Sequence, residues 1–400
     1  MDKRAVRYIL YSLLLIFLFF STIEFTTRTI SWLLGRGFTL FLHELEPYDP
    51  QVEGIYQWHP FVGYTYKPNI SLVGGDPSQK ETSRIYVDKN GFLVKNGETH
   101  IDYKKKDNEI RIAFIGGSTT ASVNLSFEEN WPGYLGMLVQ KRFPERHIQV
   151  INAAVPGFDT SEDIGNLALR VIPFKPDIVI IKHAHNDLMA IKPNTIFKPD
   201  YSHVHDKPFA YYSKPNFIIR FLNKSMFYVR LRNLWRKHKA KMKVYSDFIN
   251  LQKNMGLRIA YIPDEVSAAF EQHMHALIAI ARDAGAKVIL TSCPTLYDLK
   301  SDWSKKETFD NLSDLQKGDL DFILYYITGL TLDGFFRGLD QYNSILKRLS
   351  EQENTGWVDS ASLIPHEDKY FVDRIHFSKI GAKLMAENLL PVVLEMLKDK

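Results

Sequence analysis

The chain has 400 residues, of which 45% are hydrophobic, and this is enough apolar material for a large α/β domain with an additional segment. Its 50 basic and 46 acidic residues leave a net charge of +4, which is too balanced to indicate a nucleic-acid partner. Cys293 is the single cysteine, so an internal disulfide is excluded. Because it ends an apolar run, we expect it to be a small core residue.

The N-terminus carries a long apolar segment. Residues 8–23 are dominated by Leu, Ile and Phe and contain no charge. With residues 5–7 included, the segment reaches about the length that crosses a bilayer, because the side chain of Arg7 can extend toward the membrane surface. We therefore expect residues 5–23 to contact the lipid bilayer, and residues 1–25 to form a cytoplasmic tip and a transmembrane anchor.

The charges around this segment predict its orientation. Lys3, Arg4 and Arg7 lie at its start, and positive charge marks the cytoplasmic side of a membrane helix. This predicts a single-pass protein of the inner (cytoplasmic) membrane, with everything after Glu24 in the periplasm or outside the cell. The alternative is a cleaved signal peptide, but the residues after the apolar run contain no small-x-small cleavage motif.

Residues 26–108 are expected to form a linker and a small β-rich region that covers or leads into the main domain. Residues 30–42 are apolar but too short to span a membrane, so they lie along its surface or pack on the domain. Residues 85–87 read as a strand that is followed by an Asn90-Gly91 turn and a second strand.

From residue 109 onward, strand and helix patterns alternate. The predicted strands are residues 110–115, 148–152, 177–182, 287–291 and 356–359, and the predicted helices are residues 131–143, 162–171, 266–284, 341–351 and 381–398. Such alternation predicts a five-stranded, mostly parallel sheet with helices on both faces, which is a three-layer α/β/α architecture over residues 109–400.

One insertion, residues 193–263, breaks this alternation. It is rich in aromatic residues at first and then strongly basic between Arg230 and Lys243. The aromatic side chains suit stacking on sugar rings, but equally packing against lipid or the core. The basic stretch suits anionic lipid or an acidic polymer, whereas a solvated helix face explains it at least as well.

Four short polar blocks carry the chemistry. The first three, Gly116-Gly117-Ser118, residues 152–157 and residues 184–187, each follow a different predicted strand. The carboxyl ends of parallel strands meet at one sheet edge, so these blocks are expected to converge there. The fourth block, residues 373–376, places an acid and an imidazole three residues apart, a spacing at which a carboxylate can orient the ring.

The four blocks, in this order, resemble those of the SGNH/GDSL hydrolase family from about residue 110 to the C-terminus. The resemblance implies a flavodoxin-like sheet and a serine nucleophile, Ser118, that attacks an acyl carbonyl. Asp373 and His376 would complete the triad. The backbone N–H groups of Ser118 and Gly157 and the side-chain amide of Asn186 would form the oxyanion hole. No metal and no cofactor are implied.

The physical logic of the blocks agrees with the resemblance. A serine hydroxyl is a poor nucleophile until a base such as His376 takes its proton, and a carboxylate such as Asp373 stabilises the resulting charged ring. Two departures stand out. The first block reads Gly-Gly-Ser-Thr instead of Gly-Asp-Ser-Leu, and Ala184 replaces the usual glycine, so a methyl group could narrow the space near the oxyanion.

Each residue also has a plain structural interpretation. Ser118 suits a helix N-cap, and Gly157 suits an ordinary turn. Asn186 suits the turn at a strand end, while Asp373 suits an N-cap for a helix-start histidine, His376. Each interpretation is reasonable alone, but all four holding together in this order is the weaker account.

A metal site is a further alternative. His183-Ala184-His185-Asn186-Asp187 is similar to the His-x-His-x-Asp segment of metallo-β-lactamase-type hydrolases, in which alternating histidines share an ion. That family continues with another histidine, whereas Leu188 stands at that position here. Further histidine ligands would have to come from elsewhere in the chain: His203, His205, His273 or His275.

The function expected from these features is a membrane-anchored, extracytoplasmic serine esterase that removes acyl groups, O-acetyl above all, from a glycan or a lipid. An acyltransferase with the same triad is the nearest alternative, because the sequence does not show whether water or a sugar accepts the acyl group. A non-catalytic glycan-binding scaffold of the cell envelope and a metal-dependent hydrolase are the others. The sequence identifies no protein partner.

Overall fold

The computed structural model describes most of the chain, but not all of it. The described residues are 3–33, 55–74, 83–205 and 255–398, apart from residues 99 and 304, together with isolated residues between 222 and 235. Most of the basic and aromatic part of the predicted insertion, and residues 34–42 of the short apolar stretch, lie outside these ranges.

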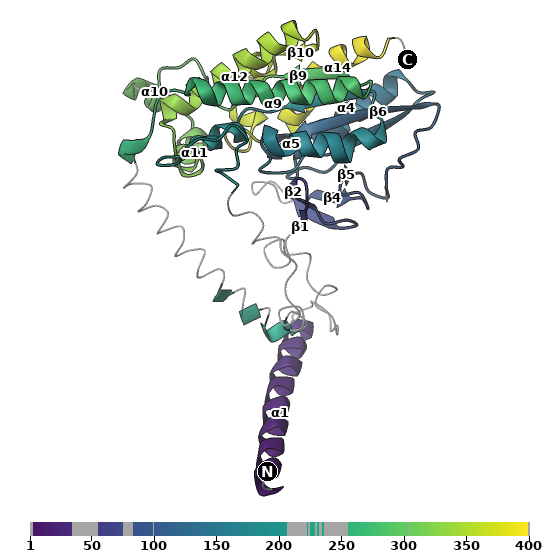
Figure 1. Cartoon of the computed structure of the whole chain (residues 1–400), viewed down its shortest axis with the longest axis vertical. Helices are drawn as coiled ribbons and strands as arrows, with labels where there is room; N and C mark the ends of the chain where they lie inside the picture. The colour runs from purple at the N-terminus through teal and green to yellow at the C-terminus, as the bar shows by residue number, and fades with distance from the viewer. Residues whose placement is uncertain are drawn as a thin grey trace. The chain divides into compact units, whose positions relative to one another are not determined.

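The smaller of two compact units contains the N-terminal helix α1, Lys3–Leu33 (Figure 1). Its segment Lys3–Ile30 is the one helix among the described residues that is long and apolar enough to cross a membrane, with a hydropathy of 2.0 and none of that window buried. The predicted apolar segment is therefore helical. A helix of this kind fits a single-pass anchor or a signal sequence.

The larger unit is built on a sheet whose centre consists of five parallel strands. They are β6 (Glu109–Gly116), β7 (His147–Asn152), β8 (Ile178–Lys182), β9 (Lys287–Thr291) and β10 (Gly356–Val358), in the spatial order β10-β9-β8-β6-β7. Every residue of β6 and β8 is buried, as expected for parallel strands that are covered on both faces. The predicted mostly parallel α/β sheet is confirmed.

The sheet has three more strands than the predicted five. Beyond β7 it continues with the antiparallel strands β5 (Leu93–Val94), β4 (Ser83–Val87) and β3 (Ser71–Gly74), in that order. Ile85 and Leu93 are fully buried, so joining the large sheet removes their side chains from water. Three strands of the predicted β-rich region thus extend the main sheet.

The region before β3 forms a separate two-stranded hairpin. Its strands are β1 (Tyr56–His59) and β2 (Gly63–Tyr66), which pair antiparallel with Trp58 opposite Tyr64. The buried side chain of Val62 in the connecting turn helps to fix the hairpin on the larger unit.

Helices cover both faces of the sheet, which confirms the three-layer architecture (Figure 1). Helices α4 (Trp131–Arg142) and α14 (Lys379–Met396) pack together on one face. Helices α5 (Thr160–Asn166), α9 (Asp264–Asp283) and α12 (Leu332–Gln352) pack together on the other.

One helix begins well before its predicted start, and another was not among the predicted helices. α12 begins at Leu332 and not at residue 341, because Thr331 caps the amide of Gly334 and an apolar stripe continues back to Phe335. α11 (Asp314–Tyr326) was not predicted, since a glycine in the middle of its sequence weakens the helix pattern.

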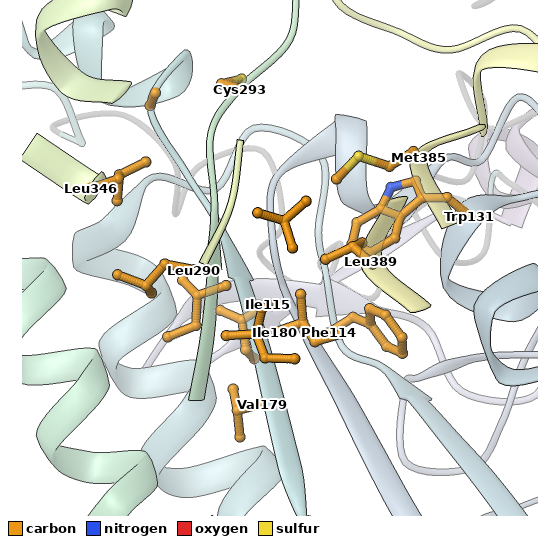
Figure 2. Packing of buried hydrophobic residues seen from close by; sticks show 14 of the residues in the cluster. Phe114, Ile115, Trp131, Val179, Ile180, Leu290, Cys293, Leu346, Met385 and Leu389 are labelled. Atoms are coloured by element: carbon orange, nitrogen blue, oxygen red, sulfur yellow. The ribbon is translucent and has the colours of Figure 1, made fainter. Parts of the chain in front are cut away.

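Part of the hydrophobic core lies between the sheet and the helices α4 and α14. Figure 2 shows Phe114 of β6 beside Trp131 of α4, with Leu389 of α14 close by. All three side chains are fully buried, and burial of each stabilises the fold by roughly 1.5–3 kcal/mol or more. This packing makes the central strands a rigid base for the loops at their carboxyl ends.

Candidate active site

Ser118 lies directly beyond the buried strand β6. It is the first residue of a single helical turn, α3 (Ser118–Ala121), and it is partly exposed whereas its neighbours Gly117 and Thr119 are buried. Gly117 occupies the N-cap position, so the interpretation of Ser118 as an N-cap is wrong. Its hydroxyl is therefore available for another partner.

That partner is His376. Its Nε2 atom lies 2.8 Å from Ser118 Oγ, and its Nδ1 atom lies 2.7 Å from Asp373 Oδ2. If Nδ1–H donates to the carboxylate, Nε2 is left as the acceptor for the serine hydroxyl. The structure thus brings together, across 258 positions of sequence, the three residues predicted as a triad.

The loop that carries this acid and base is closely hydrogen-bonded. Val372 N–H donates to the His376 carbonyl, and Asp373 Oδ1 accepts from the backbone N–H groups of Ile375 (2.9 Å) and His376 (2.8 Å). Burial alone would raise the pKa of Asp373, but these hydrogen bonds and the one from the His376 ring hold it well below its ordinary value. The carboxylate is therefore ionised at neutral pH.

Arg374, between the acid and the base, is fixed from two sides. Its N–H and its guanidinium donate to Asp319 of α11 at 2.7 and 3.3 Å, and its carbonyl accepts from Thr295 Oγ1 and from the Leu296 N–H. Asp319 was not predicted from the sequence. It is one of several acidic residues in an undistinguished helix, and no local pattern marks it.

The first three blocks meet at Gly117. A Cβ atom on this residue would lie 2.4 Å from Asn186 Nδ2 and 3.1 Å from the Phe158 carbonyl oxygen, so only glycine permits this approach. Asn186 Nδ2 also donates to the Phe158 carbonyl at 2.7 Å. Asn186 and the Gly157–Phe158 turn are therefore adjacent to Gly117, as the convergence of strand ends predicts.

A pocket with an empty volume of about 260 Å³ opens beside the serine. Its lining includes Ser118, Lys182, Ala184, His185, Asn186 and Cys293. Ala184, which stands where the resemblance has glycine, is thus one of the residues that line this pocket.

Two pocket residues were not recognised from the sequence. Lys182 ends β8 and is buried, with Nζ donating to Thr119 Oγ1 at 2.7 Å and lying 3.5 Å from Cys293 Sγ. Cys293 is buried as expected, but at the pocket wall. A lysine directly after four apolar strand residues was the one signal that could have marked this position.

The two histidines of the third block have different partners. His183 Nε2 contacts Asp163 Oδ2 at 2.7 Å, whereas His185 Nε2 accepts from Arg374 Nε at 3.4 Å. Burial, and secondly the Arg374 charge, lower the pKa of His185 to about 3, so this ring is neutral at the pocket wall. The two rings do not form the shared site that the metal alternative requires.

Among the described residues, a different set lies close enough together to hold an ion: Asp159, Glu162 and His205. Asp159 and Glu162 already form the capping box of α5, and His205 Nε2 contacts Asp159 Oδ2 at 2.9 Å. The other three histidines considered as ligands bond elsewhere, to Ala190, Thr160 and Glu353: His203, His273 and His275.

Comparison with known proteins identifies the family. The GDSL-like Lipase/Acylhydrolase family matches residues 114–384, which include all four sequence blocks. No curated protein matches the chain.

Two solved structures illustrate the range of similar folds. Axe2, an acetylxylan esterase from Geobacillus stearothermophilus, is 17% identical with a TM-score of 0.39, over 71% of this chain and 94% of that one. LAE5, an alpha/beta hydrolase enzyme from the metagenome of Lake Arreo, is 14% identical with a TM-score of 0.41, over 74% and 98%. Both scores are too low to carry over a substrate. The family match spans more than half of the sequence, and the chain therefore belongs to the GDSL-like lipase/acylhydrolase family of SGNH-type ester hydrolases.

Proposed function

We propose that this ester hydrolase uses Ser118, His376 and Asp373 as its catalytic triad to remove a short acyl group, such as acetyl, from a glycan or a lipid. The observation that carries the proposal is the continuous hydrogen-bonded chain from Ser118 Oγ through both nitrogens of His376 to Asp373 Oδ2. Such a chain is what activation of a serine hydroxyl requires.

The reaction has two similar halves. Ser118 Oγ attacks the acyl carbon while His376 Nε2 takes the hydroxyl proton, and the carbonyl electron pair moves to oxygen. Collapse of this tetrahedral intermediate breaks the bond to the alcohol, which takes the proton from His376. Water then attacks the acyl-serine with His376 again as the base, and the second collapse releases the carboxylic acid and Ser118. Asp373 stays ionised and stabilises the charged ring in both halves.

The developing oxyanion would be stabilised by three donors. They are the backbone N–H groups of Ser118 and Gly157 and the side-chain amide of Asn186, the last of which uses only one of its two N–H bonds to reach Phe158. Removal of one such donor typically lowers kcat by about 10²–10³.

The pocket supports a short acyl group. Polar side chains of Lys182 and His185 lie on its wall beside Ala184 and Cys293. A long hydrocarbon chain would be a poor match for such a lining.

We also propose that α1 anchors the enzyme in the inner membrane with its catalytic unit outside the cytoplasm. The apolar window of the helix, and the basic residues Lys3, Arg4 and Arg7 at its start, support this orientation. The lipid bilayer would then be a partner of the chain through this helix.

Ester hydrolysis by the detergent-solubilised full chain tests the proposal. With p-nitrophenyl acetate and octanoate as substrates, we expect faster hydrolysis of the acetate. Ser118→Ala should lower kcat by at least ~10³-fold, because the nucleophile is lost. Addition of a chelator should leave the rate unchanged.

Ser122→Ala is the matched control, because it removes a nearby hydroxyl that donates to the Thr119 carbonyl and not to His376. It should retain a kcat close to that of the wild type. Full activity in Ser118→Ala, or loss of activity only with the chelator, would contradict the triad.

A further inference from the structure

The β1–β2 hairpin reaches the turn that holds the proposed oxyanion donor Gly157. Tyr64 Oη donates a hydrogen bond of 2.8 Å to the Pro156 carbonyl oxygen. The Tyr64 ring also packs edge-to-face on Phe158, with 5.0 Å between the ring centroids. One side chain of the hairpin therefore contacts the residues on both sides of Gly157.

The geometry of the peptide bond explains why this contact affects the Gly157 N–H. The Pro156 carbonyl and the Gly157 N–H belong to the same planar peptide group, in which they point in opposite directions. A hydrogen bond that fixes the carbonyl therefore also fixes the direction of the N–H. Hydrogen bonding at the carbonyl also polarises the group and strengthens the N–H as a donor.

Without such a contact the turn would have more freedom. Gly157 has a φ of +90°, a conformation that glycine adopts easily but also leaves easily, and Pro156 supplies no N–H of its own. The lack of a side chain is also needed for the contact, because a Cβ on Gly157 would lie 2.7 Å from Tyr64 Oη. The contact with Tyr64 therefore requires a glycine at position 157.

The same turn also contacts another proposed donor, the side-chain amide of Asn186. The Phe158 carbonyl accepts the Asn186 amide at 2.7 Å, so the position of Asn186 depends on the turn that Tyr64 holds. A displacement of residues 156–158 would therefore move two of the three donors at once.

Packing contacts within the hairpin and with α5 hold the Tyr64 side chain, and with it the hydroxyl, in place. The Tyr64 ring packs against Tyr56 at 5.2 Å, and Tyr56 packs against the fully buried Tyr66 at the same distance. The turn of the hairpin lies against Gly165 of α5, within 3.1 Å of its ideal Cβ position. All of these hairpin residues precede the region that the family match covers, residues 114–384.

We propose that Tyr64 is a positioning residue for the oxyanion hole, whose hydroxyl orients the Pro156–Gly157 peptide group so that the Gly157 N–H faces the reacting carbonyl. The proposal rests on the proposed function, because it takes the Gly157 N–H as an oxyanion donor. It also gives the N-terminal hairpin a role in the reaction.

Tyr64→Phe in the detergent-solubilised full chain is the direct test. The variant keeps the ring and its contact with Phe158 and loses only the hydroxyl. Loss of a whole oxyanion donor costs about 10²–10³ in kcat, so a misdirected donor should lower kcat for p-nitrophenyl acetate by at least ~5-fold. KM should change by less than about 2-fold, because an oxyanion donor acts on the transition state and not on the bound ester.

A second measurement separates positioning from a general structural role. An alkylboronic acid, which forms a tetrahedral adduct with the serine, should bind Tyr64→Phe more weakly by about the same factor as kcat/KM falls. The melting temperature should remain within a few degrees of the wild type.

Tyr66→Phe is the control, since it removes a buried hydroxyl of the same strand that makes no hydrogen bond with residues 156–158 in the described structure. It should leave kcat unchanged. A Tyr64→Phe kcat within ~5-fold of the wild type would overturn the inference while Ser118→Ala remains inactive. If Ser118→Ala were fully active, the proposed function itself would fail.

Discussion

Asp187 is a fully buried carboxyl group next to the proposed oxyanion donor Asn186. Its Oδ1 accepts from the Thr160 N–H and hydroxyl at 3.0 and 2.6 Å, whereas Oδ2 lies 3.7 Å from His183 Nδ1. Burial raises the pKa of Asp187 to about 7. At acidic pH the folded protein therefore holds a proton that the unfolded chain, with an ordinary pKa of about 4, has already lost.

This difference predicts how stability depends on pH. At Asp187 the folded state binds more protons than the unfolded state between about pH 4 and pH 7, so the contribution of this group to the free energy of unfolding should fall as the pH rises. The raised pKa of His183 acts in the same direction, because its stabilising contribution is lost as the pH rises through the folded value. Asp187→Asn should remove the contribution of this carboxyl group, so the stability of the variant relative to the wild type should increase as the pH rises from about 4 to 7.

Urea unfolding of the solubilised full chain at several values between pH 4.5 and pH 8 would measure how the free energy of unfolding depends on pH in the wild type and in the variant. Asn keeps an oxygen that can accept from Thr160, so the variant is expected to fold. Parallel curves for the variant and the wild type would contradict the assignment of the raised pKa to this residue.

At the scale of elements, helix α11 supports the loop that carries His376. Asp319 accepts from the backbone and the guanidinium of Arg374, and both side chains are at least 90% buried. Removal of one partner of a buried ion pair leaves the other charge uncompensated, which typically costs about 3–5 kcal/mol.

Asp319→Ala should therefore lower the free energy of unfolding by about 3 kcal/mol or more. It should also lower kcat, because the loop between the acid and the base loses its anchor. Urea unfolding together with ester hydrolysis measures both effects. Lys317→Ala, an exposed change on the same helix, should stay within about 0.5 kcal/mol of the wild type. Equal stability of the two variants would exclude the supporting role of Asp319.

The elements differ in how far the sequence could predict them. A strand such as β8 was predictable because nearly every residue is apolar and all of them are buried. The short strand β5 has only two residues, and its place beside β7 depends on a single pairing, Leu93 with Asn152, which no local pattern encodes. The same limit applies to α11 and its Asp319.

The residues of the candidate site likewise differ in how far the sequence could predict them. Ser118 and His376 carry chemistry that a sequence pattern reveals, and the structure places them in hydrogen-bond contact. Tyr64 and Lys182 instead belong to contacts between elements far apart in the chain, such as the hydrogen bond of Tyr64 with Pro156. Only the folded arrangement makes such contacts visible.

At the scale of the whole molecule, the question is whether α1 stays attached. If it anchors the enzyme, the full-length protein of 46.3 kDa should remain in the membrane fraction after washing with alkaline carbonate. Tags at both termini should be found on the same polypeptide. A shorter, soluble protein that lacks the N-terminal tag would instead indicate a cleaved signal sequence.

The proposed triad combines segments that are distant in sequence. The serine follows the first parallel strand, β6, and the histidine precedes the last helix, α14. The sheet and the helices on its two faces bring these segments together, so the proposed reactivity of Ser118 would require the complete larger unit.

A fluorophosphonate probe, followed by peptide mass spectrometry, tests this claim most directly. If Ser118 is the nucleophile of the triad, we expect one adduct on the detergent-solubilised full chain, located on Ser118. The adduct should be absent in Ser118→Ala, strongly slowed in His376→Asn, and formed at the wild-type rate in Ser122→Ala. An adduct on a different residue, or no adduct on an enzyme that hydrolyses acetyl esters, would contradict the proposed role of Ser118 as the nucleophile.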